Sequence, residues 1–237
     1  MKILDEIIVE RVRVRMKRIK ENILPLSLMF FIPLVNIFYA LLNSSERGAF
    51  NLVTGLDNKI PFMEVFILPY VSWYGFIIFT LIYLCIYDRK IYYKTLISLI
   101  VGLVLCYITY FIFQTTVPRP KIDGSNLCAK LVLLIYGADK PYNCFPSIHV
   151  LTCFLMVRGI YSSSIKNKLN ATIISLMAAM IIISTLFVKQ HVIADVISGI
   201  LLADIIFDLM YVVEIEKYIL ILEKKASKIS PNKKLET

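Results

Sequence analysis

Long apolar runs separated by short polar segments dominate the pattern of this chain. Six of these runs are each about as long as the ~20 residues that a helix needs to cross a bilayer. They cover approximately residues 23–43, 62–87, 95–114, 145–163, 170–188 and 191–213. The pattern predicts an all-α, polytopic membrane protein in which six transmembrane helices form a single bundle over residues 23–213.

The two ends of the chain lack such runs. In residues 1–22, basic side chains are interleaved with apolar ones, which predicts an amphipathic segment lying on the membrane surface. Residues 214–237 are polar and are expected to form a cytoplasmic tail. No small-residue cleavage pattern follows the first apolar run, so we expect no cleavable signal peptide.

Composition and charge agree with a membrane protein. Apolar residues make up 58% of the chain, whereas soluble domains contain about 45–50%. The net charge of +9 indicates topology here, because 19 of the 26 lysines and arginines lie inside when both termini are cytoplasmic. Abundant Ile, Lys, Asn and Tyr are typical of AT-rich microbial genomes. We therefore expect a multi-pass protein of a bacterial plasma membrane, with no nucleic-acid partner.

Three polar segments that are far apart in the sequence fall on the same predicted face of the membrane. They are "VPRP" at 117–120, "CFPSIHV" at 144–150 and "KQHVIAD" at 189–195. Charged groups next to lipid are expensive and need either a partner or a function. The topology therefore predicts a functional site on the extracytoplasmic face.

The chain has two histidines, His149 and His191, and both lie in these segments. His191 and Asp195 are four residues apart, so on a helix they would share one face. The carboxylate would then hold one ring nitrogen of His191 and leave the other as a nucleophile. His149 would supply a proton to a leaving oxygen.

Groups that suit an anion complete this set. Ser147 lies at the start of a predicted helix, where free N–H groups attract anions. Arg119 offers a bidentate fork for phosphate oxygens, and Lys189 offers a point charge. Alternatively, Lys189 is an ordinary interfacial lysine. The full set predicts phosphoryl transfer through a phosphohistidine.

The segments resemble the signature blocks of the type 2 phosphatidic acid phosphatase (PAP2) superfamily. The blocks are "RP" at 119–120, "PSIH" at 146–149 and "STLFVKQHVIAD" at 184–195. The resemblance implies an integral membrane lipid-phosphate phosphatase that needs no metal and no other cofactor. It implies that His191 is the nucleophile, that Asp195 is its partner and that His149 is the general acid. It also implies that Arg119 and Ser147 bind the phosphate.

Three positions depart from the family pattern. Ile112 stands where the family has lysine, Ile148 where it has glycine, and Thr185 where it has arginine. Two cations are therefore missing, and Lys189 is expected to replace one of them. Together with "IPFMEVFILPYVSWY" at 60–74, the motifs look more like a divergent branch near the sphingomyelin and inositol phosphorylceramide synthases. This likeness implies an alternative function, headgroup transfer to an alcohol.

Other interpretations stay open from the residues alone. His191 and Asp195 could cap a helix junction in a catalytically silent scaffold, or bind zinc, although we find no convincing third ligand. An ion-coupled transporter would use acidic residues within the spans, but we see no paired broken helices. Those acidic residues are Glu64, Asp195, Asp204 and Asp208.

Two further features are left undetermined by the sequence. Cys128 and Cys144 flank one polar loop and could form a disulfide in an oxidising compartment. The identity of the lipid, the choice between water and an alcohol as acceptor, and the oligomeric state do not follow from the residues.

Overall fold

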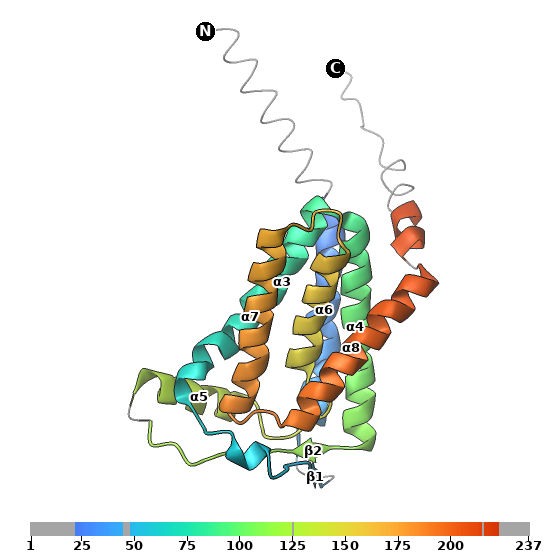
Figure 1. The fold of residues 1–237 in the computed structure, drawn as a ribbon. Helices are drawn as coiled ribbons and strands as arrows, with labels where there is room; N and C mark the ends of the chain where they lie inside the picture. Colours follow the sequence, from blue (N-terminus) through green and yellow to red (C-terminus); the bar gives the residue numbers. More distant parts are fainter. Residues whose placement is uncertain (1–21, 45–47, 125, 215, 223–237) are drawn as a thin grey trace, which may run out of the picture.

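The computed structural model describes residues 22–44, 48–124, 126–214 and 216–222. Helices that run side by side form one bundle (Figure 1). Five of them are long and apolar enough to cross a membrane: Asn22–Leu42, Glu64–Tyr87, Arg89–Ile112, Lys168–Phe187 and Ile193–Val213. The prediction of an all-α membrane protein is confirmed.

The elements follow one another in a simple order. The helices are α2 (Phe31–Leu42), α3 (Ile67–Tyr87), α4 (Arg89–Ile112), α5 (Leu127–Ala138), α6 (Ile148–Ser162), α7 (Lys168–Phe187) and α8 (Ile193–Val213). Two short strands, β1 (Phe50–Asn51) and β2 (Thr115–Thr116), pair in parallel. Three 3₁₀ turns complete the described elements. Leu28–Phe30 leads into α2, Asp57–Lys59 lies in the loop after β1, and Glu64–Phe66 leads into α3.

Helix α6 is the centre of the bundle, and it is shorter than the span predicted over 145–163. It packs against α3, α4, α7 and α8, and its 15 residues extend only about 22 Å. The helix starts late because Ser147 is its N-cap, with the hydroxyl oxygen accepting a bond from the amide of Val150 at 3.3 Å. The consecutive residues Ile148–Cys153 are all buried, as expected for a helix with neighbours on every side.

The approach of α8 to the start of α6 depends on Gly199. A Cβ atom at this position would lie 2.9 Å from the carbonyl oxygen of Ser147 and 3.0 Å from the Cβ of Val150. Only glycine therefore allows the two backbones to come this close. This contact fixes the distance between two helix N-termini that both lie at the candidate site.

Two helix boundaries differ from the prediction. The third span was expected over 95–114, but α4 begins at Arg89, where the side chain of Asp88 accepts a bond from the amide of Ile91 at 3.2 Å. Hydropathy excluded this first turn because it is charged, although a good cap extends the helix through it. Helix α5 lies in a stretch that we expected to be a loop.

The aspartates in the last span have a partner. Arg158 of α6 donates hydrogen bonds to both Asp204 and Asp208 of α8. A cation between two carboxylates lowers the cost of placing all three groups in an apolar bundle. These aspartates therefore join helices and lie away from the candidate site.

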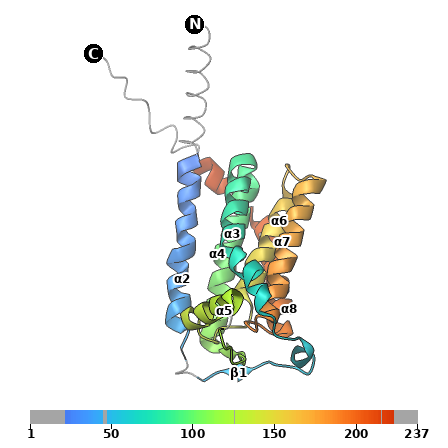
Figure 2. The same ribbon diagram turned by 90° about the vertical axis from the view of Figure 1, so that its left-hand side faces the viewer.

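The two ends of the bundle differ in character. One end carries the turn between α3 and α4 and the turn between α6 and α7, while the other carries β1, β2 and α5 (Figures 1 and 2). The three polar segments that we expected to converge all lie at the second end. The predicted surface segment 1–22, apart from Asn22, and the tail from 223 onward fall outside the described residues.

Candidate active site

His191 and Asp195 meet at the start of α8. The Nδ1 atom of His191 lies 3.2 Å from Oδ2 of Asp195, and both side chains are buried. The expectation that they share a helical face is wrong, because α8 begins at Ile193 and His191 lies in the loop before it. Asp195 Oδ2 also accepts a bond from the amide of Val192 at 3.0 Å. The carboxylate thus caps the helix and binds the imidazole at once.

His149 lies directly beside this pair. Its Nδ1 atom is 3.4 Å from Nε2 of His191. The rings of Tyr70 and Trp73 from α3 pack against the His149 ring at centroid distances of 4.8 Å and 4.4 Å. The structure therefore places His191 between Asp195 and His149, with one ring nitrogen in contact with each. When Nδ1–H of His191 donates to Asp195, its Nε2 lone pair faces His149.

Ser147 lies next to these residues but is occupied as a cap. It is fully buried, and its amide donates to the carbonyl oxygen of Asp195 at 3.2 Å. This bond ties the start of α6 to the first turn of α8. The N-termini of both helices therefore point into one region, where their partial positive charge favours an anion.

Arg119 reaches the same region from the segment after β2. It donates to the carbonyl oxygens of Tyr136 at 3.2 Å and Asp139 at 2.7 Å, and to Oε1 of Gln190 at 2.6 Å. Its guanidinium also stacks 4.2 Å from the centre of the Tyr136 ring. These contacts hold the guanidinium next to Gln190, the residue that directly precedes His191.

Lys189 faces the same pocket but binds backbone. It adopts a left-handed conformation with φ of 51°. Its ammonium donates to the carbonyl oxygens of Ile60 at 2.6 Å and Asp57 at 3.2 Å. Lys189 therefore joins the loop before α3 to the loop before α8 and also brings a positive charge near His191.

A cavity of about 350 Å³ lies in front of these groups. Arg119, Lys189 and His191 line it together with Asp57 and the neighbouring prolines. Among the described residues, three buried polar atoms here have no hydrogen-bond partner: Nε of Arg119, Nε2 of Gln190 and Oδ1 of Asp195. Two of the three are N–H donors. Buried donors are nearly always paired, and the oxygens of a bound anion would satisfy these two donors, though not Oδ1 of Asp195.

Gln190 was missed by the sequence interpretation. Its side chain links Arg119 to the loop of His191, which no spacing rule predicts. Its position directly before His191 was the available signal. Thr185, the position of the missing arginine, is fully buried, and its carbonyl oxygen accepts bonds from the amides of Gln190 and His191. Ile112, the position of the missing lysine, is 75% exposed at the end of α4.

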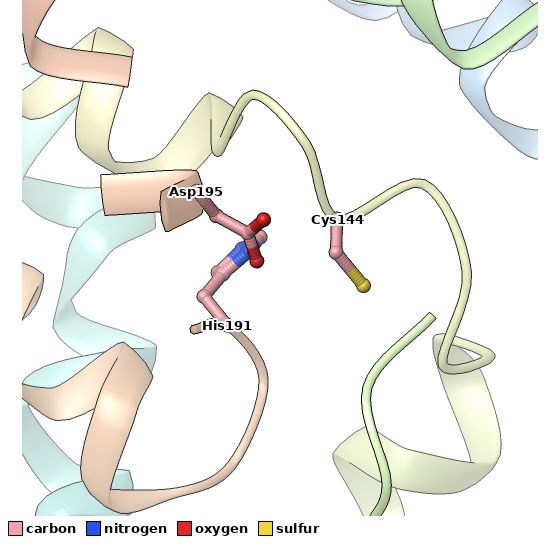
Figure 3. Close-up of side chains that lie close together, drawn as sticks. All are labelled: Cys144, His191 and Asp195. Atoms are coloured by element: carbon pink, nitrogen blue, oxygen red, sulfur yellow. The ribbon is translucent and has the colours of Figure 1, made fainter. Parts of the chain in front are cut away.

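Cys144 supplies the third potential metal ligand that the sequence argument did not find. Ligand atoms of Cys144, His191 and Asp195 lie within 4.8 Å of one another, and Figure 3 shows the Cys144 side chain approaching His191 and Asp195 from a different segment. Burial, reinforced by Asp195 and Asp139, raises the pKa of the Cys144 thiol. Cys128 and Cys144 are both free cysteines in this structure, so the disulfide that the sequence left open is not formed here.

Asp57 joins the loop before α3 to the start of α8. Its carboxylate accepts bonds from the amide of Ile193 at 2.8 Å and from the amide and hydroxyl of Thr54 at 2.8 Å and 2.5 Å. Burial by itself would raise the pKa of Asp57, but these hydrogen bonds together lower it. The ionised carboxylate of Asp57 therefore stabilises the folded state at pH values above the ordinary carboxyl pKa. This stabilisation is lost as the pH falls through the lowered pKa of Asp57 in the folded protein.

We expect Asp57→Asn to lower the melting temperature by an amount equivalent to about 1–2 kcal/mol and activity by about tenfold. The amide nitrogen would face the donors of Thr54 and loosen the loop that binds Lys189. In detergent, the melting temperature of Asp57→Asn should lie below that of the wild type by a constant amount between about pH 6 and 8. This difference in melting temperature should narrow below about pH 4. A difference that stays constant to about pH 3 would contradict this role of the carboxylate.

Comparison with known proteins adds one finding. A family model described as the PAP2 superfamily matches residues 92–217, which is more than half of the chain. The match covers α4 to α8 and includes all six residues predicted for the site. No curated protein and no solved structure was found to match the chain.

Proposed function

The chain belongs to the PAP2 superfamily, and on this premise we propose that it is an integral membrane lipid-phosphate phosphatase that works through phospho-His191. Membership of the superfamily supports a phosphatase-type or phosphotransferase-type activity on phosphate esters. The lipid nature of the substrate, the hydrolytic outcome and the histidine mechanism are our proposal.

The first chemical step forms a bond between Nε2 of His191 and phosphorus. Asp195 holds the Nδ1–H of His191, which leaves the Nε2 lone pair free to attack and stabilises the imidazolium that develops. The bond between phosphorus and the ester oxygen breaks, and His149 donates a proton to that oxygen. The lipid leaves as an alcohol, or as a monophosphate when the substrate is a diphosphate.

The second step returns the enzyme to its starting state. His149, now without the donated proton, removes a proton from water as the water oxygen attacks phosphorus. The bond between Nε2 and phosphorus breaks and inorganic phosphate is released. In this structure, Nδ1 of His149 lies 3.4 Å from Nε2 of His191, so the substrate phosphate has to replace this contact before attack.

One observation carries the proposal. Beside His191, the Nε of Arg119 and the Nε2 of Gln190 are buried donors that have no acceptor among the described residues. A phosphate at His191 would offer oxygens to both, and charge-assisted bonds of this kind are among the strongest in proteins. The helix N-termini at Ser147 and Val192 add positive potential at the same place.

The position of the site favours a lipid substrate. The histidine pair lies at one end of helices whose surfaces are apolar over membrane-spanning length. A phosphate carried by a membrane lipid reaches this depth without leaving the bilayer. We propose that this end faces the extracytoplasmic side, because the opposite end carries basic turns such as Arg89 and Lys90.

We expect phosphate release to survive EDTA, because every group in the proposed mechanism belongs to the chain. The test measures inorganic phosphate and headgroup transfer on a panel of lipids in metal-free detergent. The panel contains phosphatidate, a polyprenyl diphosphate and phosphatidylglycerol phosphate. A loss of activity that Zn²⁺ or Mg²⁺ reverses in the wild type, and not in Cys144→Ser, would contradict the mechanism and indicate a metal at Cys144. Transfer to an alcohol without phosphate release would replace hydrolysis as the outcome.

A further inference from the structure

A second cavity lies between the helices of the bundle and has no lining residue in common with the pocket that contains Arg119. Its volume is about 520 Å³, within the range of about 300–1,000 Å³ typical of small-molecule sites. Side chains from the helix that ends in α2, and from α3, α4 and α6, line it, and nearly all of them are apolar. The lining includes Phe30, Tyr74 and Ile78, which are 75%, 59% and 48% exposed. The cavity therefore opens on the lipid-facing surface of the bundle.

This opening follows from the way the helices pack. Helix α2 packs mainly against α4 and makes much less contact with α3, and it stands at the edge of the bundle (Figure 2). The space between α2 and α3 is therefore not filled by close helix contact. Hydrocarbon is the surrounding medium at this depth.

The inner end of the cavity reaches the catalytic region through Trp73. The indole nitrogen of Trp73 donates to the hydroxyl oxygen of Thr152 at 2.8 Å, and both residues line the cavity. The Trp73 ring also packs against the His149 ring at 4.4 Å between centroids. Trp73 is therefore the wall between the cavity and His149.

The polar groups at this inner end are already engaged. Thr152 accepts from Trp73 and donates to the carbonyl oxygen of Ile148 at 2.7 Å. Asn36, which also lines the cavity, accepts a bond from the hydroxyl of Tyr107. A polar ligand would find few free partners here. The chemistry of the lining fits a hydrocarbon chain.

We propose that this cavity binds one hydrocarbon chain of the lipid substrate and that Trp73 positions the chain against His149. The inference rests on the proposed function, since it assumes that the phosphate at His191 is carried by a lipid. The phosphate would occupy the pocket on the His191 side, and the chain would lie on the His149 side. A chain that moves from the bilayer into the cavity gains no exclusion of water, so selection depends on shape and van der Waals packing.

Fluorescence offers a direct test, because Trp73 is the only tryptophan of the chain. The full-length protein in lipid nanodiscs is titrated with phosphatidate that carries bromine-labelled acyl chains, since bromine quenches indole fluorescence at short range. Phosphatidylcholine with the same labelled chains is the control for bulk lipid. We expect saturable quenching by phosphatidate that exceeds quenching by phosphatidylcholine. Equal and unsaturable quenching by both lipids would overturn the proposal.

A matched pair of variants tests the cavity by activity. Ile78 lines the cavity and Ile86 does not, although both lie on α3 with exposures of 48% and 49%. We expect Ile78→Phe to raise the KM for dioleoyl phosphatidate at least about threefold and to remove the excess quenching. Dihexanoyl phosphatidate, whose chains are too short to fill the cavity, should be much less affected. Ile86→Phe should match the wild type in every assay, and identical behaviour of the two variants would overturn the proposal.

The two assays separate this inference from the proposed function. Selective quenching without phosphate release would leave the chain cavity in place and contradict the phosphatase. Phosphate release from long-chain phosphatidate, with no selective quenching and no effect of Ile78→Phe, would contradict the cavity and leave the phosphatase. If neither signal appears, both proposals fail for this lipid class.

Discussion

His191→Ala is expected to reduce phosphate release by at least about a thousandfold, since removal of a catalytic nucleophile typically has effects of this size or larger. The side chain supplies the only atom of the protein that bonds to phosphorus in the proposed mechanism. Water would then have to attack the ester directly, without the imidazole. The rate is measured in detergent with saturating phosphatidate, and thermal unfolding of the same sample shows whether the fold is intact.

A trapping experiment makes this prediction specific for a phosphohistidine. Wild-type protein mixed with radiolabelled phosphatidate and denatured rapidly should retain label that is lost in acid and stable in base. His191→Ala should retain none. His149→Ala should still form the labelled intermediate, slowly, because His149 moves protons and does not bond to phosphorus. Wild-type activity in His191→Ala would exclude the phosphohistidine mechanism.

Asp195→Asn is expected to lower kcat by about a thousandfold or more, with KM changed little. The carboxylate holds the Nδ1–H of His191 at 3.2 Å and stabilises the imidazolium as the bond to phosphorus forms. An amide that turns its NH₂ group toward Nδ1 would reverse the tautomer. The proton would then lie on Nε2, and the nucleophilic lone pair would be lost.

The control for this prediction lies on the same helix. Asp204→Asn makes the same chemical change in α8, but Asp204 bonds Arg158 and lies away from the histidines. It should therefore retain most of the activity. A loss of less than about tenfold in Asp195→Asn would indicate that the carboxylate acts mainly as the cap of α8. The interpretation of His191 and Asp195 as a structural pair would then be preferred.

The amino-acid pattern was sufficient for the architecture, because the physical constraint behind it is local. A backbone in a bilayer has to satisfy its own hydrogen bonds, so each apolar run of sufficient length forms a helix. The sequence therefore predicted the all-α bundle with six spans. Five of them are long helices among the described residues, and the sixth, α6, is shorter than predicted. It failed where local chemistry competes with hydropathy. The charged first turn of α4, capped by Asp88, is an example. The sequence prediction also missed α5, which is apolar but has only 12 residues, too few for a spanning run.

The gathering of the site residues also followed from the sequence, since the alternation of spans places Arg119, His149 and His191 at the same end. Its detailed geometry did not. His191 lies in a loop before α8, and its contact with Asp195 comes from helix capping, which depends on where the helix starts. Sequence spacing alone does not determine such a boundary.

Only the tertiary structure decided which other residues contact the site. Gln190 pairs with Arg119, Cys144 approaches His191, and Trp73 covers His149 from α3. These contacts join segments that are tens of residues apart, and they depend on how closely helices approach, as at Gly199. The sequence by itself determined the medium in which the chain folds and the chemical groups available to it. Packing decided which of those groups touch, because side-chain contacts across helices have no signature in local periodicity.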